Sequence, residues 1–481
     1  MSSSAPRQAQ LPLDFVIVGA SISGLLTAFG LARSGHRVRV FEKAPEIIRH
    51  GSGVRLAPNS MNSLKRWGFE AQIRKYGSPV QGTLFMNMED GKEIGYTEWA
   101  DDLVKESGSV WCAISYTDFI RILYEAAASV GVKFYTSAPV ASVTPPEEDA
   151  ENQRPFITLE DGRTFDGDIV VGCDGAYSVV RRVVEDPDEP TEPQHTGLIS
   201  FAGDVPMEEI AKDPYLKKDD IINGMPFWAT TNGALRGNPH VGTDGKHYMF
   251  HLFWKEDMDV ETTWEPVVPT DSLTITKAPG LHQSVQRLVK LAPKVSVKRW
   301  DKWPEVEDWV DYSETVVLVG EAAHPDSVPF GYQNAGNPVE SATVFATLFS
   351  YLRTRSQIST FLHAYEDLRH KRAREFVAGE SETAQLFFLP PGPERDRRDK
   401  QMAGTLQMRG QTGWDYEFLE QQWNGISHVW TYNGVDAAES WWVEWGILAE
   451  RAQLSNAESN GNGSSIRFDT LDINVSAVDH E

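Results

Sequence analysis

Cysteine is scarce in this sequence. The 481 residues contain two cysteines, Cys112 and Cys173, which lie far apart and have no metal-ligand spacing. This pattern excludes a disulfide-stabilised scaffold, predicts no metal site and is typical of proteins from a reducing compartment. We therefore expect a cytoplasmic protein.

Long apolar runs and positive charge are also lacking. No segment approaches the ~20 apolar residues that cross a bilayer, and residues 1–12 are polar, without the apolar core of a secretory signal. Lys and Arg number 45 against 69 Asp and Glu, which gives a formal net charge of −24. Because nucleic acid and anionic membranes repel an acidic chain, neither is expected as a partner.

The most informative pattern lies near the start of the chain. Residues 15–18 are a short apolar run that predicts a buried parallel strand. Gly19 then permits a tight turn, Ser21 stands where the common motif has its middle glycine, and Gly24 lets a helix over residues 25–34 pack closely on the sheet. Such a helix offers its N-terminal N–H groups to a pyrophosphate.

An acidic residue completes this pattern. A second strand, residues 36–41, ends in Glu42, which is placed to accept hydrogen bonds from an adenosine ribose. The order of strand, turn, helix, strand and acid predicts a dinucleotide site. A glycine-rich turn without a ligand is the alternative.

Three separated motifs together resemble the single-component (group A) FAD-dependent aromatic monooxygenases, in particular the fungal, salicylate hydroxylase-like type. They are the turn at 19–24, Gly-Cys-Asp-Gly-Ala-Tyr-Ser-Val-Val-Arg at 172–181, and Gly-Glu-Ala-Ala-His-Pro at 320–325. The segment Thr-Tyr-Asn-Gly-Val-Asp at 431–436, with Trp441 and Trp442, also resembles the C-terminal ending of fungal relatives. The resemblance covers most of residues 13–445.

The resemblance implies an α/β fold. Its parts are a Rossmann-like (GR2-type) FAD-binding domain, an interposed, mostly antiparallel β-sheet substrate domain and C-terminal helices. We place the discontinuous FAD-binding domain at 13–190 and 310–375, the substrate domain at 191–309 and the helical region at 376–455. Residues 456–481, rich in Ser, Asn, Gly and Asp, are expected to be a disordered tail.

The resemblance also implies a set of cofactor contacts. Asp174 and Gly175 would serve both a non-covalent FAD and a visiting NADPH or NADH, although Asp-Gly is also a common turn. Glu321 replaces the family's Asp against the ribityl chain. Gly53, Arg55 and Ala335 belong to loops that lie against the flavin in this family. His324 of the third motif is expected to be structural.

Several departures from the family pattern bear on the substrate. The flavin loop at 329–336 is altered, notably at Tyr332, Asn334 and Gly336. Tyr116 replaces an arginine that contacts FAD, and Ala202 stands near the position of an arginine that some relatives use to hold a substrate anion. We therefore expect changed FAD contacts and an uncharged or weakly charged aromatic substrate.

One strand is a candidate wall of the substrate cavity. Residues 247–254 alternate, so that one face should pack on the core while the other, which includes His251, lines a cavity. An unperturbed histidine suits general base catalysis. We consider His251 a candidate base and Arg55 a candidate catalytic contact, with an ordinary satisfied histidine and a solvated arginine as the alternatives.

The expected function is an FAD-dependent NAD(P)H monooxygenase. Such an enzyme uses O₂, through a flavin C4a-hydroperoxide, to hydroxylate or epoxidise an electron-rich aromatic such as a phenol or indole of secondary metabolism. The altered flavin loop leaves open an FAD-binding oxidase, cyclase or isomerase. A non-catalytic FAD-binding protein is a third possibility. The sequence does not indicate the oligomeric state.

Overall fold

The computed structural model describes most of the chain. The described residues are 6–48, 53–80, 82–99, 106–147, 153–185, 192–216, 225–242, 245–255, 267–325, 335–409, 416–448 and 450–451. The predicted tail at 456–481 and the altered flavin-loop residues Tyr332 and Asn334 lie outside them. Within the described part, no helix is both long and apolar enough to cross a membrane.

A five-stranded parallel sheet forms the first layer of the molecule and joins strands from residue 14 to residue 318. Its order is β19, β12, β1, β2 and β8. β1, β12 and β19 are short and largely apolar, as expected for a sheet covered on both faces, whereas β2 carries Arg37 and Arg39. Their bounds are β1 Asp14–Val18, β2 Arg37–Phe41, β8 Lys133–Tyr135, β12 Ile169–Gly172 and β19 Val316–Leu318.

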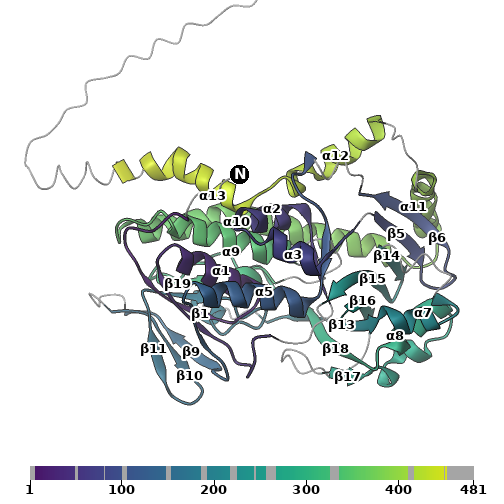
Figure 1. The fold of residues 1–481 in the computed structure, drawn as a ribbon, viewed down its shortest axis with the longest axis horizontal. Coiled ribbons are helices and arrows are strands. Elements are labelled where there is room, and N and C mark those ends of the chain that lie inside the picture. Colours follow the sequence, from purple (N-terminus) through teal and green to yellow (C-terminus); the bar gives the residue numbers. More distant parts are fainter. Residues whose placement is uncertain are drawn as a thin grey trace, which may run out of the picture.

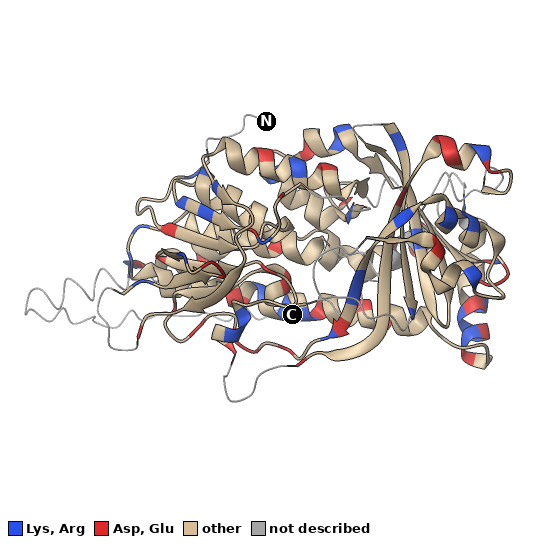
Figure 2. Cartoon of the chain, turned by 90° about the horizontal axis from the view of Figure 1, so that it is seen from below, with Lys and Arg blue, Asp and Glu red and all other residues tan. Residues whose placement is uncertain are grey.

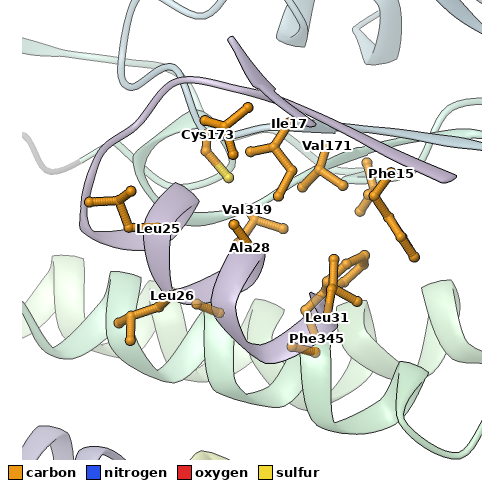
Figure 3. Close-up of a cluster of buried hydrophobic side chains, with 14 of the residues drawn as sticks. Phe15, Ile17, Leu25, Leu26, Ala28, Leu31, Val171, Cys173, Val319 and Phe345 are labelled. Atoms are coloured by element: carbon orange, nitrogen blue, oxygen red, sulfur yellow. The ribbon is translucent and has the colours of Figure 1, made fainter. Parts of the chain in front are cut away.

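Helix α1 (Ile22–Arg33) is buried between this sheet and helix α9 (Gly336–Phe349). Figure 3 shows Leu25, Leu26, Ala28 and Leu31 of α1 between sheet side chains and Phe345 of α9. Helix α9 is buried along its whole length. The core thus fixes the N-terminal ends of two helices relative to the sheet.

An eight-stranded sheet forms the second layer of the molecule. Its order is β17, β18, β13, β16, β15, β14, β5 and β6, and every pairing is antiparallel except β14 with β5. This confirms the expected α/β fold with a mostly antiparallel second sheet. The bounds are β5 Gly82–Asn87, β6 Glu93–Glu98, β13 Gln194–Pro206, β14 Met225–Thr230, β15 Gly233–Gly242, β16 Gly245–Lys255, β17 Val267–Pro269 and β18 Lys294–Lys302.

This sheet is not drawn from one continuous segment. Strands β5 and β6 come from the stretch that we assigned to the FAD-binding domain, and β14 pairs with β5. Helix α10 (Gln357–Phe387) likewise runs through the expected boundary at 375. The division into domains stays a prediction.

Figure 1 shows the eight-stranded sheet at one end of the molecule and a small sheet, β9 to β11, at the other, with α1, α5, α9 and α10 between them. The two small sheets are β11-β10-β9 and β3-β7-β4. Their strands are β3 Val54–Leu56, β4 Ser78–Pro79, β7 Cys112–Ile114, β9 Val140–Thr144, β10 Phe156–Leu159 and β11 Thr164–Asp166. The remaining helices are α2 Pro58–Arg66, α3 Glu70–Tyr76, α5 Tyr116–Ser129, α6 Arg181–Val184, α7 Met207–Lys212, α8 Gln283–Leu291, α11 Pro393–Ala403, α12 Tyr416–Trp430 and α13 Gly434–Trp441; the shorter helical turns are η3 Thr270–Ser272, η4 Thr274–Lys277, η5 Gly320–Ala322, η6 Gly404–Met408 and the π-helical η7 Trp442–Gly446.

A buried polar network holds the first turns of α9. Glu340 accepts a hydrogen bond from the side-chain amide of Asn59 of α2. It also forms an ion pair with Arg372 of α10, in which Arg372 Nε lies 2.7 Å from Glu340 Oε2. Arg369 of α10 also pairs with Glu340 and donates to Asn337 at 2.9 Å. Because Glu340 and Arg369 are fully buried, these contacts fix the start of α9 firmly.

Candidate functional site

A cavity of about 420 Å³ lies where the carboxyl ends of β1, β2 and β12 approach the eight-stranded sheet. Ligands of open parallel sheets bind at this edge. The cavity is also lined by His251 of β16 and by Lys298 and Trp300 of β18. Of the predicted cofactor residues, those on its wall are Gly19, Ser21, Glu42, Gly53, Arg55, Asp174, Gly175, Glu321 and Ala335.

The first motif forms a turn too tight for side chains. Gly19 has φ +98°, and a Cβ there would lie 2.5 Å from the carbonyl oxygen of Cys173. Gly24 does not line the cavity; a Cβ on it would lie 2.0 Å from the carbonyl oxygen of Gly19. Gly24 therefore allows α1 to approach the turn, as the sequence predicts. Ser21 is the N-cap of α1 and bonds to Cys173 O at 3.2 Å.

Glu42 stands at the end of β2 and is buried. One carboxylate oxygen accepts the N–H of Ala20 at 2.9 Å and the other accepts the N–H of Ala44 at the same distance. The first bond ties the acid to the turn before α1. Each carboxylate oxygen can accept more than one hydrogen bond, so capacity remains for ribose hydroxyls.

Asp174 organises the second motif. Its carboxylate accepts from the hydroxyl of Ser178 at 2.5 Å and from the backbone N–H of Val179 at 2.7 Å. Burial raises the pKa of Asp174, while these hydrogen bonds favour its charged form. The turn interpretation and the cofactor interpretation therefore apply together, because Asp174 closes the turn and also lines the cavity.

The second and third motifs are joined by Arg181. This buried side chain donates to the backbone carbonyls of Ala322 at 2.8 Å and Glu321 at 3.1 Å. The Glu321 carboxylate lies on the cavity wall, where a Cβ on Gly175 (φ +83°) would approach its Oε2 at 3.9 Å. Lys298 of β18 donates to both oxygens of Glu321, at 3.3 and 3.2 Å.

The N-terminus of α9 reaches the same cavity. Ala335 is its N-cap, and Pro338 of its first turn also lines the wall. A helix N-terminus favours negative charge. His324 bonds to Ser341 of α9 at 3.0 Å, and burial lowers the pKa of His324 to about 3. These properties support a structural role for His324.

The residues present fit an FAD. Gly19 and Gly24 keep the turn before α1 free of side chains, α1 offers its N-terminal N–H groups, and Glu42 and Glu321 offer carboxylate acceptors along one wall. Tyr116, at the first turn of α5, lines the cavity where the family has an arginine. The cations that line the cavity among the described residues are Lys43, Arg55 and Lys298.

Arg55 and His251 meet on the sheet side of the cavity. The guanidinium of Arg55 lies 3.5 Å from His251 Nδ1 and donates from Nε to Asn238 Oδ1 at 3.0 Å. Burial, Arg55 and Arg236 together hold the pKa of His251 well below its usual value. Since a guanidinium only donates, Nδ1 of this neutral histidine is the acceptor and Nε2 bears the proton. These properties are those of a hydrogen-bond donor more than of a general base.

Sequence reasoning missed Arg236. It lies on β15 directly opposite His251, while Ala202 lies opposite His251 on the other side, on β13. Our expectation of an uncharged or weakly charged substrate considered β16, the neighbourhood of Ala202 and Arg55, but not β15. The available signal was a polar residue at every second position, Arg236, Asn238 and His240, in an apolar strand.

Lys298 was also missed, and no sequence pattern singled it out. In the described molecule as a whole, acidic and basic residues are interspersed along the ribbon (Figure 2).

Among the described residues, no group of three or more His, Cys, Asp or Glu side chains could hold a metal ion. The thiols of Cys112 and Cys173 are buried and free, and burial raises the pKa of both, to about 12 for Cys112.

Comparison with known proteins agrees with this geometry. The family model described as "FAD binding domain" matches residues 13–380. The chain belongs to this family. It is 26% identical over 439 residues to FAD-dependent monooxygenase OpS4 of Beauveria bassiana, covering 89% of this chain and 96% of that protein. It is 30% identical over 397 residues to 3-amino-4-hydroxybenzoate 2-monooxygenase of Streptomyces cremeus, covering 82% and 92%.

The fold is also that of a solved relative. A salicylate hydroxylase substrate complex superposes with a TM-score of 0.67 at 22% identity, covering 89% of this chain and 95% of that one. This confirms the expected fold. The family match confirms that the chain is an FAD-binding protein, while its assignment to the single-component, fungal type stays a prediction.

Proposed function

We propose that the protein is an FAD-dependent monooxygenase that uses NADPH or NADH and O₂ to hydroxylate or epoxidise an electron-rich aromatic. The observation that carries this proposal is the single cavity shared by the cofactor motifs and by Arg55 and His251 next to the antiparallel sheet. A cofactor held by the motifs would therefore have a substrate wall beside it. The relatives of this chain include a 3-amino-4-hydroxybenzoate 2-monooxygenase.

The residues that would hold FAD divide along the cavity. Glu42 would bind the adenosine ribose, the N-terminus of α1 the pyrophosphate, and Glu321 the ribityl chain. The N-terminus of α9, beginning after Ala335, would stabilise negative charge on the ring system. When bound, FAD supplies hydride acceptance and O₂ activation, whereas the protein supplies positioning and electrostatics.

The chain's own residues would act on the aromatic. Arg55 holds a fixed position through Asn238, and His251 would donate a hydrogen bond from Nε2 to a ring substituent. The strand around them packs its other face on an apolar core that includes Tyr248, Phe250 and Leu252. A rigid wall of this kind keeps the reacting ring aligned and limits the access of water.

The nicotinamide nucleotide would bind transiently. The turn at Gly19 follows β1 of the five-stranded sheet, and we assign that turn to FAD. NADPH or NADH would then reach the cofactor through a groove near Asp174 and Gly175. We place the enzyme in the cytoplasm on the strength of its two free, buried thiols.

A purified sample tests this proposal against its rivals. We expect a yellow protein that releases FAD on denaturation and oxidises NADPH or NADH faster when a hydroxylated aromatic is present. Substrate turnover without NAD(P)H would instead identify an oxidase, cyclase or isomerase. Bound FAD with no turnover of any hydroxylated aromatic would favour a non-catalytic binding protein.

A further inference from the structure

Four titratable side chains are hydrogen-bonded to one another beside the second motif, and none of them belongs to the FAD contacts described above. They are Tyr177 of that motif, His195 of β13, and Arg299 and Asp301 of β18, and we call them the Asp301 cluster. His195 and Asp301 are directly opposite each other on antiparallel strands. Tyr177 reaches them from the loop that follows β12.

Asp301 is the centre of this cluster, and its side chain is completely buried. His195 Nδ1 lies 2.9 Å from Asp301 Oδ1, and Arg299 Nε donates to Asp301 Oδ2 at 2.9 Å. The hydroxyl of Tyr177 also donates to Oδ2, and it accepts from Arg299 Nη2 at 3.0 Å. Asp301 thus joins Tyr177 to His195 through its two carboxylate oxygens.

The charges of the cluster follow from these contacts. Burial acts to raise the pKa of Asp301, but hydrogen bonds from Tyr177, His195 and Arg299 outweigh burial and hold that pKa below its usual value. An ionised carboxylate only accepts, so Nδ1 of His195 bears the proton. Burial and the contact with Asp301 raise the pKa of Tyr177 to about 12, so its hydroxyl keeps its proton at neutral pH.

The two ends of the cluster lie in different surroundings. Tyr177 lines the candidate FAD cavity, and the ring of Trp303 packs edge-on against it with the ring centres 5.0 Å apart. The side chain of His195, at the other end, is 65% exposed. Tyr177, Asp301 and His195 therefore form a continuous hydrogen-bonded path from the cavity to water.

The proposed reaction needs such a path, because it takes up one proton in each turnover. An aromatic C–H, NAD(P)H and O₂ give the hydroxylated product, NAD(P)⁺ and water only if one H⁺ is also consumed. A cavity filled by cofactor and substrate excludes water. The proton must then reach the cavity through side chains.

We propose that Tyr177, Asp301 and His195 form a proton relay that carries this proton from water into the cavity. The demand for a proton rests on the proposed function. Tyr177 gives its hydroxyl proton to a basic atom in the cavity, and Arg299 stabilises the tyrosinate that remains. His195 passes its Nδ1 proton to Asp301 and takes up another from water at Nε2. A half-turn of the Asp301 carboxyl group then returns the proton to Tyr177, so that every group recovers its starting state.

Reoxidation of photoreduced flavin tests the relay without NAD(P)H and without an aromatic. Oxidation of the anionic reduced flavin by O₂ to give H₂O₂ also consumes one proton. The purified holoenzyme is photoreduced with EDTA in the absence of oxygen and then mixed with O₂ in weakly buffered solution. Flavin absorbance and a pH-indicator dye record reoxidation and proton uptake together. For the parent protein, we expect rates that do not change with the buffer concentration.

Two variants remove the two ends of the relay. In His195→Ala, both signals should slow about tenfold or more, as for the loss of a positioned proton donor, and added imidazole should restore them. Tyr177→Phe should be equally slow with or without imidazole. His363→Ala is the matched control, because His363 is also an exposed histidine on a carboxylate, Glu314, at 3.0 Å. This control should react like the parent.

Parent-like rates in either relay variant would overturn the proposal. Slow reoxidation in His195→Ala that imidazole does not relieve would also overturn it, because that result would indicate a structural role. The relay and the proposed function fail separately. Slow, imidazole-restored reoxidation without transfer of ¹⁸O from ¹⁸O₂ to any aromatic would remove the monooxygenase and leave the relay. Labelled product together with parent-like reoxidation in His195→Ala would remove the relay alone.

Discussion

Lys298 of β18 donates to both carboxylate oxygens of Glu321, so a cation of the eight-stranded sheet pairs with an acid at the end of the parallel sheet. The pair lies on the wall of the candidate FAD cavity. Where the family has Asp, the longer Glu321 side chain reaches this partner.

Lys298→Met tests the role of this pair. Both side chains are about one third exposed, so we expect the free energy of unfolding to change by less than ~1 kcal/mol. FAD affinity should fall about fivefold, because Glu321 would face the cofactor without a compensating charge. Fluorescence titration of the apoprotein with FAD measures this, with exposed Lys302→Met on the same strand as the control. Unchanged affinity would remove Lys298 from the site.

Glu42→Gln tests the ribose assignment. The amide can accept on one side only, so it cannot both hold the turn through Ala20 and Ala44 and accept from a ribose. Loss of a charged hydrogen bond is worth ~1.5–3 kcal/mol, which predicts FAD binding weaker by about 10- to 100-fold. If the dissociation constant for FAD matches that of the parent, the ribose does not bind at Glu42.

Glu340→Gln should destabilise the fold. The substitution leaves the buried Arg369 without its full counter-charge, and breaking a buried pair costs about 3–5 kcal/mol. Chemical denaturation measures the loss. Glu439→Gln is the control, because its pair with Arg66 has side chains 42% and 48% exposed and should cost under ~1 kcal/mol. Similar losses in the two variants would contradict the buried network.

Acid should weaken the fold through three buried histidines. Burial lowers the pKa of His36 to about 4, that of His324 to about 3, and that of His251 well below its usual value. In the unfolded chain these histidines take up protons near pH 6.5. The contribution of the buried, neutral histidines to the free energy of unfolding is therefore fully present above that pH and is lost as the pH falls toward the folded pKa values. Each histidine contributes up to ~1.4 kcal/mol per pH unit.

Denaturation between pH 7 and pH 5 measures this slope. The carboxyl of Asp14, with a pKa lowered to about 2 by Arg37, loses its contribution only below about pH 4, outside this window. Asp174 opposes the trend, because its raised pKa lets the folded state take up a proton in acid. His324→Asn should flatten the slope, and an unfolding free energy that stays constant down to pH 5 would contradict the assignment.

The sequence predicted those parts of the site that depend on local geometry. Gly19 and Glu42 follow directly after a parallel strand and Glu321 comes three residues after the end of another, and such strand ends meet at one edge of a sheet. Gly24 could be predicted for the same reason, since its role depends on the turn five residues earlier. The alternation in β16 also predicted that His251 would line a cavity.

The arrangement of Arg55, Arg236 and His251 could not be predicted in this way. Arg236 lies opposite His251 only because β15 pairs with β16 in one register, and Arg55 reaches Asn238 and His251 from a strand that precedes them by more than 180 positions. The placement of β5 and β6 in the eight-stranded sheet is equally non-local. Long-range register of this kind follows from packing and leaves little trace in local pattern.

Incorporation of labelled oxygen tests the central claim most directly. The holoenzyme is supplied with NADPH or NADH, ¹⁸O₂ and a set of hydroxylated aromatics, and the products are analysed by mass spectrometry. The account predicts a product that contains one ¹⁸O atom, formed in proportion to the NAD(P)H oxidised. A product formed without ¹⁸O, or without consumption of NAD(P)H, would show that this FAD-binding protein is not a monooxygenase.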